Sequence, residues 1–329
     1  MTVALEELLE SARVVALPLA NRFRGIDVRE AMLLKGPFGW TEFSPFVEYE
    51  DAEAAAWLAA AIDFGWSDVA LPKDAPARIR VNATLPAVSP QEVGAVLDRF
   101  PGCRTVKVKV AEAGQSIADD VARVARAREY LGPDGRIRVD ANGSWNVDEA
   151  EHAIHALAEH DLEYVEQPCA TVDELEQIRR RVKYMGIPIA ADESVRKAAD
   201  PIAVARAKAA DILVIKAQPL GGIASALRVI RKAKLPVVVS SALDTSVGLS
   251  MGAYLAASIP GGPTFDSGLG TAALLAADVT STPLLPTDGQ IDVRRIEVEE
   301  SLLTQYAASP ARTTWWMDRL KRTHALLPN

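Results

Sequence analysis

The chain has 329 residues, of which 49% are hydrophobic and 24% are charged, and its formal net charge is −8 at pH 7. These values predict a soluble globular protein with room for one large domain and a smaller one. The negative charge, uncompensated by any long basic run, argues against binding to nucleic acid. No apolar run approaches the roughly 18 residues that a membrane span needs.

The N-terminal segment and the cysteines predict a reduced, cytoplasmic protein. The segment MTVALEELLESARVV carries acidic residues where a secretory signal peptide would carry positive charge. The two cysteines, Cys103 and Cys169, do not form a Cys-x-x-Cys pair. Neither a disulfide framework nor a zinc site is therefore indicated.

Residues 11–50 predict an antiparallel sheet. The runs ARVVALPL, REAMLLKG and GWTEFSPF have the composition of strands, and glycines such as Gly25 and Gly36 separate them. A helix is expected to follow over about residues 52–64.

From about Arg78, eight candidate strands alternate with helical sequence. Most are continuous apolar runs, which are typical of parallel strands buried on both faces. Capping boxes at 116–119 and 171–174 mark two helix starts. After about residue 283 the stretch STPLLPTDGQ does not resemble another strand–helix unit, so we expect the tail to return to the N-terminal domain. The candidate strands are IRVNATL (79–85), TVKVKV (105–110), RIRVD (136–140), LEYVE (162–166), IPIAAD (187–192), DILVIK (211–216), PVVVS (236–240) and PTFDSG (263–268).

Four of these segments deliver a charged residue at a nearly constant interval. Asp140, Glu166, Asp192 and Lys216 are 26, 26 and 24 residues apart, and each stands at or just beyond a strand end. A strand–helix repeat of this length is typical of a parallel α/β barrel. Catalytic groups of such barrels come from the C-terminal ends of successive strands. The pattern therefore predicts one polar cluster at one barrel mouth, and hence an enzyme.

Two lysines on one predicted strand belong to the same cluster. Lys107 and Lys109 share a face, about 7 Å apart along the strand, and the valines between and beside them must pack against helices. The shared face is then the barrel interior, where a lysine is costly unless function or pairing keeps it there. The structural alternative is a lysine–acid network inside the barrel.

The three carboxylates predict a metal site. Two carboxylates about 4 Å apart repel by roughly 1 kcal/mol in water and by about 4 kcal/mol at an effective dielectric of 20. Asp140, Glu166 and Asp192 therefore need a cation or must bind protons. Oxygen ligands favour a hard ion, and Mg²⁺ is the default because it leaves positions open for substrate. A single strand-end aspartate is usually a helix cap, so the prediction depends on the joint placement.

Several motifs resemble those of a known family. VKVKV, VDANGSW (139–145), VEQP (165–168), ADES (191–194) and VIKAQPLGG (214–222) resemble the muconate-lactonising-enzyme branch of the enolase superfamily. Residues 22–46 and VVSSALDTSVG (238–248) are similar to its o-succinylbenzoate synthase family, in the short form typical of actinobacteria. The resemblance covers nearly the whole chain. It implies an α+β capping domain over 1–77, a modified (β/α)₇β TIM-type barrel over 78–282, and a C-terminal segment, 283–329, that packs back on the capping domain.

The same resemblance implies roles for individual residues. A capping-domain loop with Arg22, Phe23 and Arg24 closes on the substrate, and either arginine could touch it. Glu193 is expected to lie behind the metal ligands. The implied site comprises Asp140, Glu166 and Asp192 as Mg²⁺ ligands, Lys109 as general acid/base, Lys216 across the site, Lys107 beside the substrate carboxylate, and Asn142 and Ser240 on the substrate side.

The reaction that the family implies is a dehydration. 2-Succinyl-6-hydroxy-2,4-cyclohexadiene-1-carboxylate would lose water to give 2-succinylbenzoate, a menaquinone precursor, with Lys109 acting first as base and then as acid. Lys107, Lys216 and the ion are expected to lower the pKa of Lys109. Because two lysines oppose each other, an N-succinylamino acid racemase or dipeptide epimerase is an alternative; a non-catalytic binding barrel is another. The expected partner is a small carboxylate, with no nucleic acid or membrane, and the oligomeric state stays open.

Overall fold

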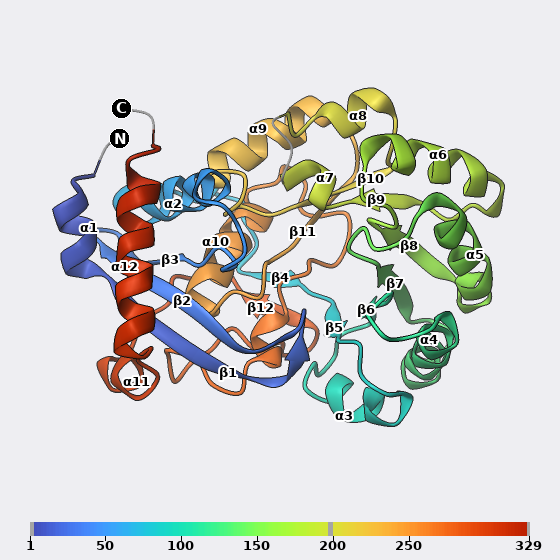
Figure 1. Cartoon of the computed structure of the whole chain (residues 1–329), viewed down its shortest axis with the longest axis horizontal. Coiled ribbons are helices and arrows are strands. Elements are labelled where there is room, and N and C mark those ends of the chain that lie inside the picture. Colours follow the sequence, from blue (N-terminus) through green and yellow to red (C-terminus); the bar gives the residue numbers. More distant parts are fainter. Residues whose placement is uncertain (1–2, 197–199, 328–329) are drawn as a thin grey trace.

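The N-terminal part of the chain is a three-stranded antiparallel sheet. The computed structural model describes residues 3–196 and 200–327. In it, β1 (Arg13–Phe23) pairs with β2 (Ile26–Gly36), which pairs with β3 (Gly39–Phe43), as the sequence predicts. Helices α1 (Leu5–Ser11) and α2 (Asp51–Trp66) pack against it (Figure 1). A Cβ on Gly36 would lie 2.1 Å from the carbonyl oxygen of Gly65, so β2 and α2 can meet this closely only through glycine.

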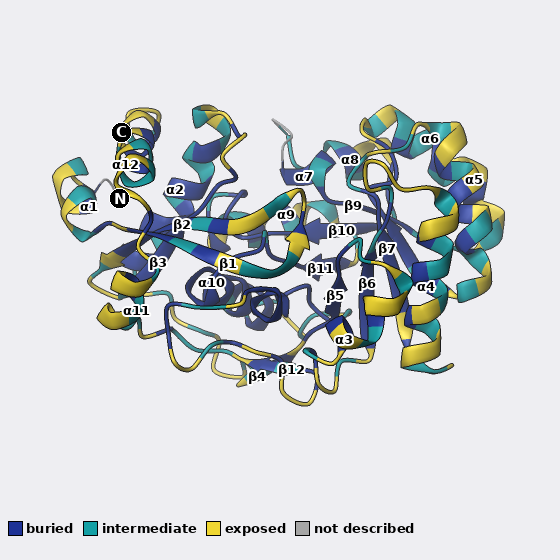
Figure 2. Ribbon diagram, turned by 60° about the horizontal axis from the view of Figure 1, so that its bottom comes forward, coloured by how far each residue is buried: buried dark blue, intermediate teal, exposed yellow. Residues whose placement is uncertain are grey.

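The larger part is a curled sheet of seven parallel strands. They follow chain order: β5 (Ala83–Leu85), β6 (Thr105–Lys109), β7 (Arg136–Asp140), β8 (Leu162–Glu166), β9 (Ile189–Ala191), β10 (Ile212–Ile215) and β11 (Val237–Val239). Outside them run α3 (Val93–Leu97), α4 (Ile117–Leu131), α5 (Val147–Leu157), α6 (Val172–Val182), α7 (Glu193–Arg196), α8 (Ala203–Ala207), α9 (Ile223–Ala233) and α10 (Ser246–Ala257). The strands are buried, whereas the outer faces of helices such as α4 and α5 are exposed (Figure 2). The predicted α/β barrel is confirmed.

Two predicted strands differ from their expected form. The run 263–268 makes only single bridges, in which Ser267 accepts from the Asn82 amide (2.9 Å) and Gly268 donates to the Val239 carbonyl (2.8 Å). These bridges join both edges of the seven-stranded sheet and close the barrel. The run 79–85 is broken in two: β4 (Arg78–Arg80) leaves the barrel and pairs antiparallel with β12 (Gln290–Asp292), and only β5 continues as a barrel strand.

Both predicted capping boxes are present. The Ser116 hydroxyl accepts from the backbone N–H of Asp119, whose carboxylate accepts from the Ser116 amide in return; Thr171 and Glu174 make the same exchange at α6. These bonds satisfy N–H groups that the first turn of a helix otherwise leaves unpaired. They fix where each helix begins, and so how long the loop after the preceding strand is.

The C-terminal helix lies against the N-terminal sheet and α2. After α11 (Glu300–Gln305), helix α12 (Pro310–His324) buries Trp316, whose indole donates to Glu30 (2.9 Å). The buried guanidinium of Arg319 donates to the carbonyls of Phe46 (3.1 Å) and Tyr49 (2.6 Å). The domain boundaries at 77 and 282 stay predictions. Among the described helices, none combines the length and apolar character needed to cross a membrane.

Candidate active site

The charged residues singled out by the sequence lie together at the C-terminal ends of neighbouring strands. Lys109, Asp140 and Glu166 are in register across β6, β7 and β8. Asp192 follows β9 and Lys216 follows β10, so both stand at the same end of the barrel. Parallel strands with equal register are sufficient to bring these groups to one mouth.

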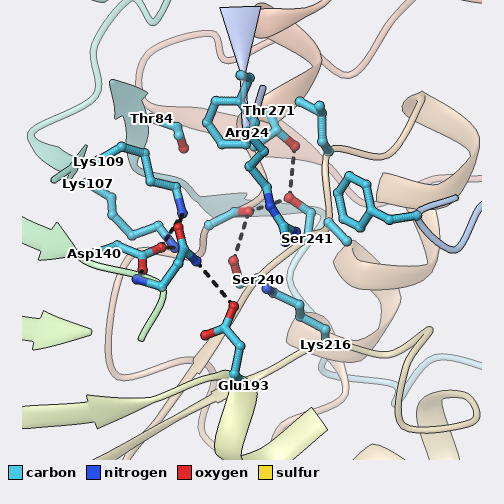
Figure 3. A pocket seen from close by; sticks show the side chains of 16 residues that line it. Arg24, Thr84, Lys107, Lys109, Asp140, Glu193, Lys216, Ser240, Ser241 and Thr271 are labelled. Atoms are coloured by element: carbon cyan, nitrogen blue, oxygen red, sulfur yellow. Dashed lines mark hydrogen bonds and ion pairs between the residues drawn. The ribbon is translucent and has the colours of Figure 1, made fainter. Parts of the chain in front are cut away.

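Lys107 and Lys109 converge on one carboxylate. The Lys109 Nζ donates to Asp140 Oδ2 (2.5 Å) and to the amide oxygen of Asn142 (2.7 Å). The Lys107 Nζ lies 3.3 Å from the same Asp140 oxygen and 2.9 Å from Glu166 Oε1. Figure 3 shows both lysines on one side of the pocket and Lys216 on the other. The lysine–acid network considered from the sequence is therefore present, on the inner face of the strands.

A second group of charges surrounds Asp192. The Lys216 Nζ donates to Asp192 Oδ2 (2.6 Å), and the Arg196 Nε lies 3.3 Å from Asp192 Oδ1. Arg196 also donates to Glu193 Oε1 (2.8 Å), which accepts from Asn142 Nδ2 (3.2 Å) as well. Asp192 Oδ1 and Glu193 Oε2 are buried oxygens that accept no hydrogen bond from the described residues. Such oxygens are costly to bury unless another group binds them.

Burial and the neighbouring charges set the pKa of each carboxyl. Burial alone would raise the pKa of Asp140, but Lys109 and Lys107 hold it well below its usual range. Burial opposes ionisation at Asp192 too, and Lys216 and Arg196 still lower its pKa to about 2. At Glu166, burial and the charge of Asp140 raise the pKa to about 7 even though Lys107 lies close by.

The pKa values of the two lysines of β6 are shifted in opposite directions. Burial lowers the pKa of both. At Lys107 the charges of Glu166 and Asp140 outweigh burial, and its pKa lies well above the ordinary value. At Lys109, Asp140 opposes the effect of burial, but Lys107 adds to it, and the pKa is lowered. Lys109 is thus the lysine of the pair that gives up its proton more easily, in agreement with the expectation from the sequence.

The donor atoms suit a hard cation. Asp140, Glu166 and Asp192 offer only oxygen, the ligand type of Mg²⁺ and similar ions. In the described part of the chain, no three His, Cys, Asp or Glu side chains lie close enough to hold one ion between them. A lysine ammonium group faces each of these three carboxylates. A bound cation would take over the neutralisation that the lysines now provide. Asp192 Oδ1 accepts no hydrogen bond from the described residues and has only the Arg196 guanidinium 3.3 Å away, which supports this fit. The assignment of these residues as ligands stays a prediction.

The pocket above these charges is lined from both parts of the molecule. The N-terminal sheet and the loop after it contribute Phe23, Arg24 and Phe46, and the segment after β11 contributes residues 240–243. Arg24 points into the pocket (Figure 3), whereas Arg22 makes an exposed ion pair with Asp27 (3.8 Å). Of the two arginines that the sequence left open, Arg24 lines this pocket, and Arg22 lines an adjoining cavity that shares Lys109 and Asn142 with it.

The predicted substrate-side residues Asn142 and Ser240 line the pocket, and so does Glu193, which was expected behind the ligands. Sequence reasoning missed Gln167, whose side-chain oxygen accepts from the Asp192 amide (2.9 Å) and thereby ties the end of β8 to the loop that carries this carboxylate. It also missed Thr84, Ser241 and Thr271. The polar run directly after the apolar strand PVVV was the one available signal for Ser241.

Comparison with known proteins identifies the family. Residues 14–65 match the family described as "Enolase N-terminal domain-like" and residues 93–296 the one described as "Enolase C-terminal domain-like". The chain is 52% identical to the o-succinylbenzoate synthase of Thermobifida fusca over 96% of both chains. It is also 52% identical to that of Mycobacterium tuberculosis, over 98% of this chain and 96% of the relative. Muconate lactonizing enzyme from Pseudomonas putida, 17% identical, has the same fold, with a TM-score of 0.74 over 90% of this chain and 98% of that one.

Proposed function

Because the chain belongs to the o-succinylbenzoate synthase family of the enolase superfamily, we propose that it is a hydro-lyase that dehydrates 2-succinyl-6-hydroxy-2,4-cyclohexadiene-1-carboxylate to 2-succinylbenzoate. The observation that carries the proposal is the arrangement of charges at the barrel mouth. A lysine with a lowered pKa and a second lysine lie on opposite sides of a pocket that is also lined by the carboxylates of Asp140 and Glu193 (Figure 3).

The metal is an integral part of the proposal. Enzymes of this family generally depend on a metal ion, and we propose Mg²⁺ held by Asp140, Glu166 and Asp192. When bound, the ion neutralises negative charge that develops on the substrate carboxylate as the α-proton leaves. Lys107, which lies beside Asp140 and Glu166, is placed to bind the same carboxylate.

Lys109 moves the proton. Its Nζ, in the neutral form that burial and Lys107 favour, takes the proton from the ring carbon that bears the carboxylate. The same ammonium then donates a proton to the departing hydroxyl of the neighbouring carbon. The C–O bond breaks, water leaves and the ring becomes aromatic. One residue can serve both steps when the proton and the hydroxyl leave from the same face.

Lys216 supplies positive charge from the opposite face without moving a proton. Its Nζ is engaged with Asp192 at 2.6 Å. Phe23 and Phe46 of the N-terminal part line the pocket and add apolar surface to it, which disfavours water near the reacting groups.

The alternative functions are less well supported than dehydration. Relatives at 52% identity carry the synthase name, which does not favour a racemase, an epimerase or a non-catalytic barrel. We also propose that the product serves menaquinone synthesis and that the enzyme is cytoplasmic. The decisive measurement is the ultraviolet change on dehydration of the cyclohexadiene substrate, run beside a racemisation assay with N-succinyl amino acids. Racemisation without dehydration would refute the proposal.

A further inference from the structure

One wall of the pocket contains a strained turn. Residues 240–243 follow β11 and line the pocket, and Leu243 has φ = 62°. This left-handed region is unfavourable for a residue with a Cβ other than Asn or Asp. A residue held there persists only where its surroundings impose the conformation.

Arg29 reaches this turn from the N-terminal sheet. It lies on β2 and is 2% exposed. Its Nε donates to the Leu243 carbonyl (3.0 Å), and its Nη2 lies 3.4 Å from the Ala242 carbonyl as a second, longer hydrogen bond. The same Nη2 donates to the backbone and side-chain oxygens of Ser44 (2.5 and 3.0 Å). The guanidinium also stacks on Phe46, 4.5 Å from the ring centre. The planar fork of an arginine can bind several oxygens at once in fixed directions, which a lysine cannot.

Glu42 fixes the continuation of the same segment. This buried carboxylate of β3 accepts from the amide and hydroxyl of Thr245 (3.1 and 2.6 Å) and from the Gly248 amide (3.0 Å). Gly248 makes this possible, since a Cβ there would lie 2.8 Å from the Glu42 carboxylate. Two side chains of the N-terminal sheet thus bind the backbone on both sides of Asp244.

We propose that Arg29 is a positioning residue: by binding the carbonyl oxygens of Ala242 and Leu243, it holds the left-handed turn that shapes the substrate-facing wall. Arg29 does not line the pocket itself. The wall therefore takes its final shape only when the N-terminal sheet is docked on the barrel. The inference rests on the proposed dehydration for its kinetic assay.

The kinetic test compares Arg29→Lys and Arg29→Gln with the wild type. A displaced wall should weaken substrate binding and leave proton transfer by Lys109 nearly intact, so KM should rise more than kcat falls. Losing a buried hydrogen bond to a charged group predicts a rise in KM of about 10-fold or more. Arg128→Gln is the matched control, because Arg128 binds the carbonyls of Gly132, Gly135 and His160 outside the pocket. It should lower the Tm and leave KM unchanged.

A second-site variant tests whether Arg29 acts through Leu243. Glycine adopts a positive φ without strain, so in a Leu243→Gly background the same Arg29 substitutions should raise KM by less than about a third of their effect in the wild type. An unchanged KM in folded Arg29→Gln, or an equal rise with leucine and with glycine at 243, overturns the proposal. If Arg29→Gln does not fold, Arg29→Lys carries the test.

A binding-independent readout separates this inference from the proposed function. Hydrogen–deuterium exchange of residues 240–245 should be faster in Arg29→Lys than in the wild type and unchanged in Arg128→Gln. Inactivity of the wild type toward the cyclohexadiene substrate would refute the proposed function, whereas unchanged exchange in Arg29→Lys would refute the role of Arg29.

Discussion

Lys107 and Lys109 show how a shift of two residues along one strand changes the chemistry of a side chain. Lys107 lies between two carboxylates, and Lys109 has Asp140 on one side and the charge of Lys107 on the other. The first is held as a cation suited to bind an anionic substrate. The second gives up its proton more easily and suits proton transfer. Because side chains alternate between the two faces of a strand, both lysines of β6 lie on the same face. Their spacing in the sequence is sufficient to predict this.

The different roles of Lys109 and Lys216 can be separated by arginine substitutions. Arginine keeps the positive charge but does not release its proton near neutral pH. Lys109→Arg should therefore lose dehydration, by more than the about 10²–10⁴-fold typical of one acid/base group, because it serves both steps. Lys216→Arg should keep a measurable rate if the longer side chain fits. The measurement is the initial rate of each variant, with circular dichroism to confirm folding.

Near-wild-type dehydration by Lys109→Arg would show that the base is another residue. If both variants are inactive, a steric clash at Lys216 is distinguished from a chemical role by Lys216→Ala with an added small amine. Recovery of the rate with the amine would support a role of positive charge at that position.

The proposed metal site predicts a reversible loss of activity. EDTA should abolish dehydration, and Mg²⁺ or Mn²⁺ should restore it, because the substrate carboxylate then regains its counter-charge. Asp192→Asn should be nearly inactive but folded, and calorimetry should detect weaker binding of Mn²⁺ to it than to the wild type. Full turnover in a verified metal-free sample would contradict the assignment.

At the scale of elements, the sequence predicts most reliably those features that depend on neighbouring residues. The apolar runs ending at Asp140 and Glu166 predicted β7 and β8, and the capping boxes predicted the starts of α4 and α6. The errors occur where pairing with distant segments decides the outcome. Residues 78–80 leave the barrel because β12, more than 200 residues later, offers a partner. The run 263–268 closes the barrel by isolated bridges, which no local pattern distinguishes from a strand.

The contact between β3 and α10 predicts a pH-dependent stability. Burial and the nearby charge of Asp244 raise the pKa of Glu42 to about 7, against the opposing charge of Arg29. The folded protein thus holds a proton that the unfolded chain releases above about pH 4.5. The stabilisation from this proton is fully present below about pH 4.5 and is lost as the pH rises to about 7. One pKa unit corresponds to about 1.4 kcal/mol, so the effect should be visible in the Tm.

Glu42→Gln isolates this contribution, since glutamine keeps the shape of the side chain and does not titrate. The Tm of the wild type minus that of Glu42→Gln should fall between pH 5 and pH 8. Glu30→Gln is the control. Burial would raise the pKa of Glu30, but the hydrogen bond from Arg312 outweighs burial and the pKa is lowered. The contribution of Glu30 to stability therefore changes only below about pH 4.5. If the Tm of the wild type minus that of Glu42→Gln stays constant or grows with pH, the raised pKa of Glu42 is contradicted.

The pocket joins segments that no sequence pattern connects. The barrel carboxylates and lysines could be predicted because one repeat places them. In contrast, Phe46 reaches the pocket, and Arg29 and Glu42 reach the backbone behind its wall, only through docking of the N-terminal sheet. Arg319 of α12 holds the loop that carries Phe46 by donating to the carbonyls of Phe46 and Tyr49. The proposed catalytic groups thus stand at the strand ends, and residues of the docked sheet complete the lining of the pocket.

The different roles proposed for Lys109 and Lys216 predict how the enzyme acts on substrates of related reactions. Racemisation requires two groups that each exchange a proton with the substrate, from opposite faces. Lys109 and Lys216 have that placement, and each Nζ binds a carboxylate, that of Asp140 and that of Asp192. The proposed dehydration needs a proton-transfer group only at Lys109. In a dedicated synthase, N-succinyl amino acids should exchange their α-proton in D₂O slowly or not at all, while the cyclohexadiene substrate is dehydrated rapidly. The measurement is deuterium incorporation by proton NMR in both enantiomers, with Lys109→Arg as the control in which only exchange by a group other than Lys109 can remain. Incorporation into both enantiomers at a rate comparable to dehydration would mean that Lys216 also transfers protons and that the enzyme has two activities.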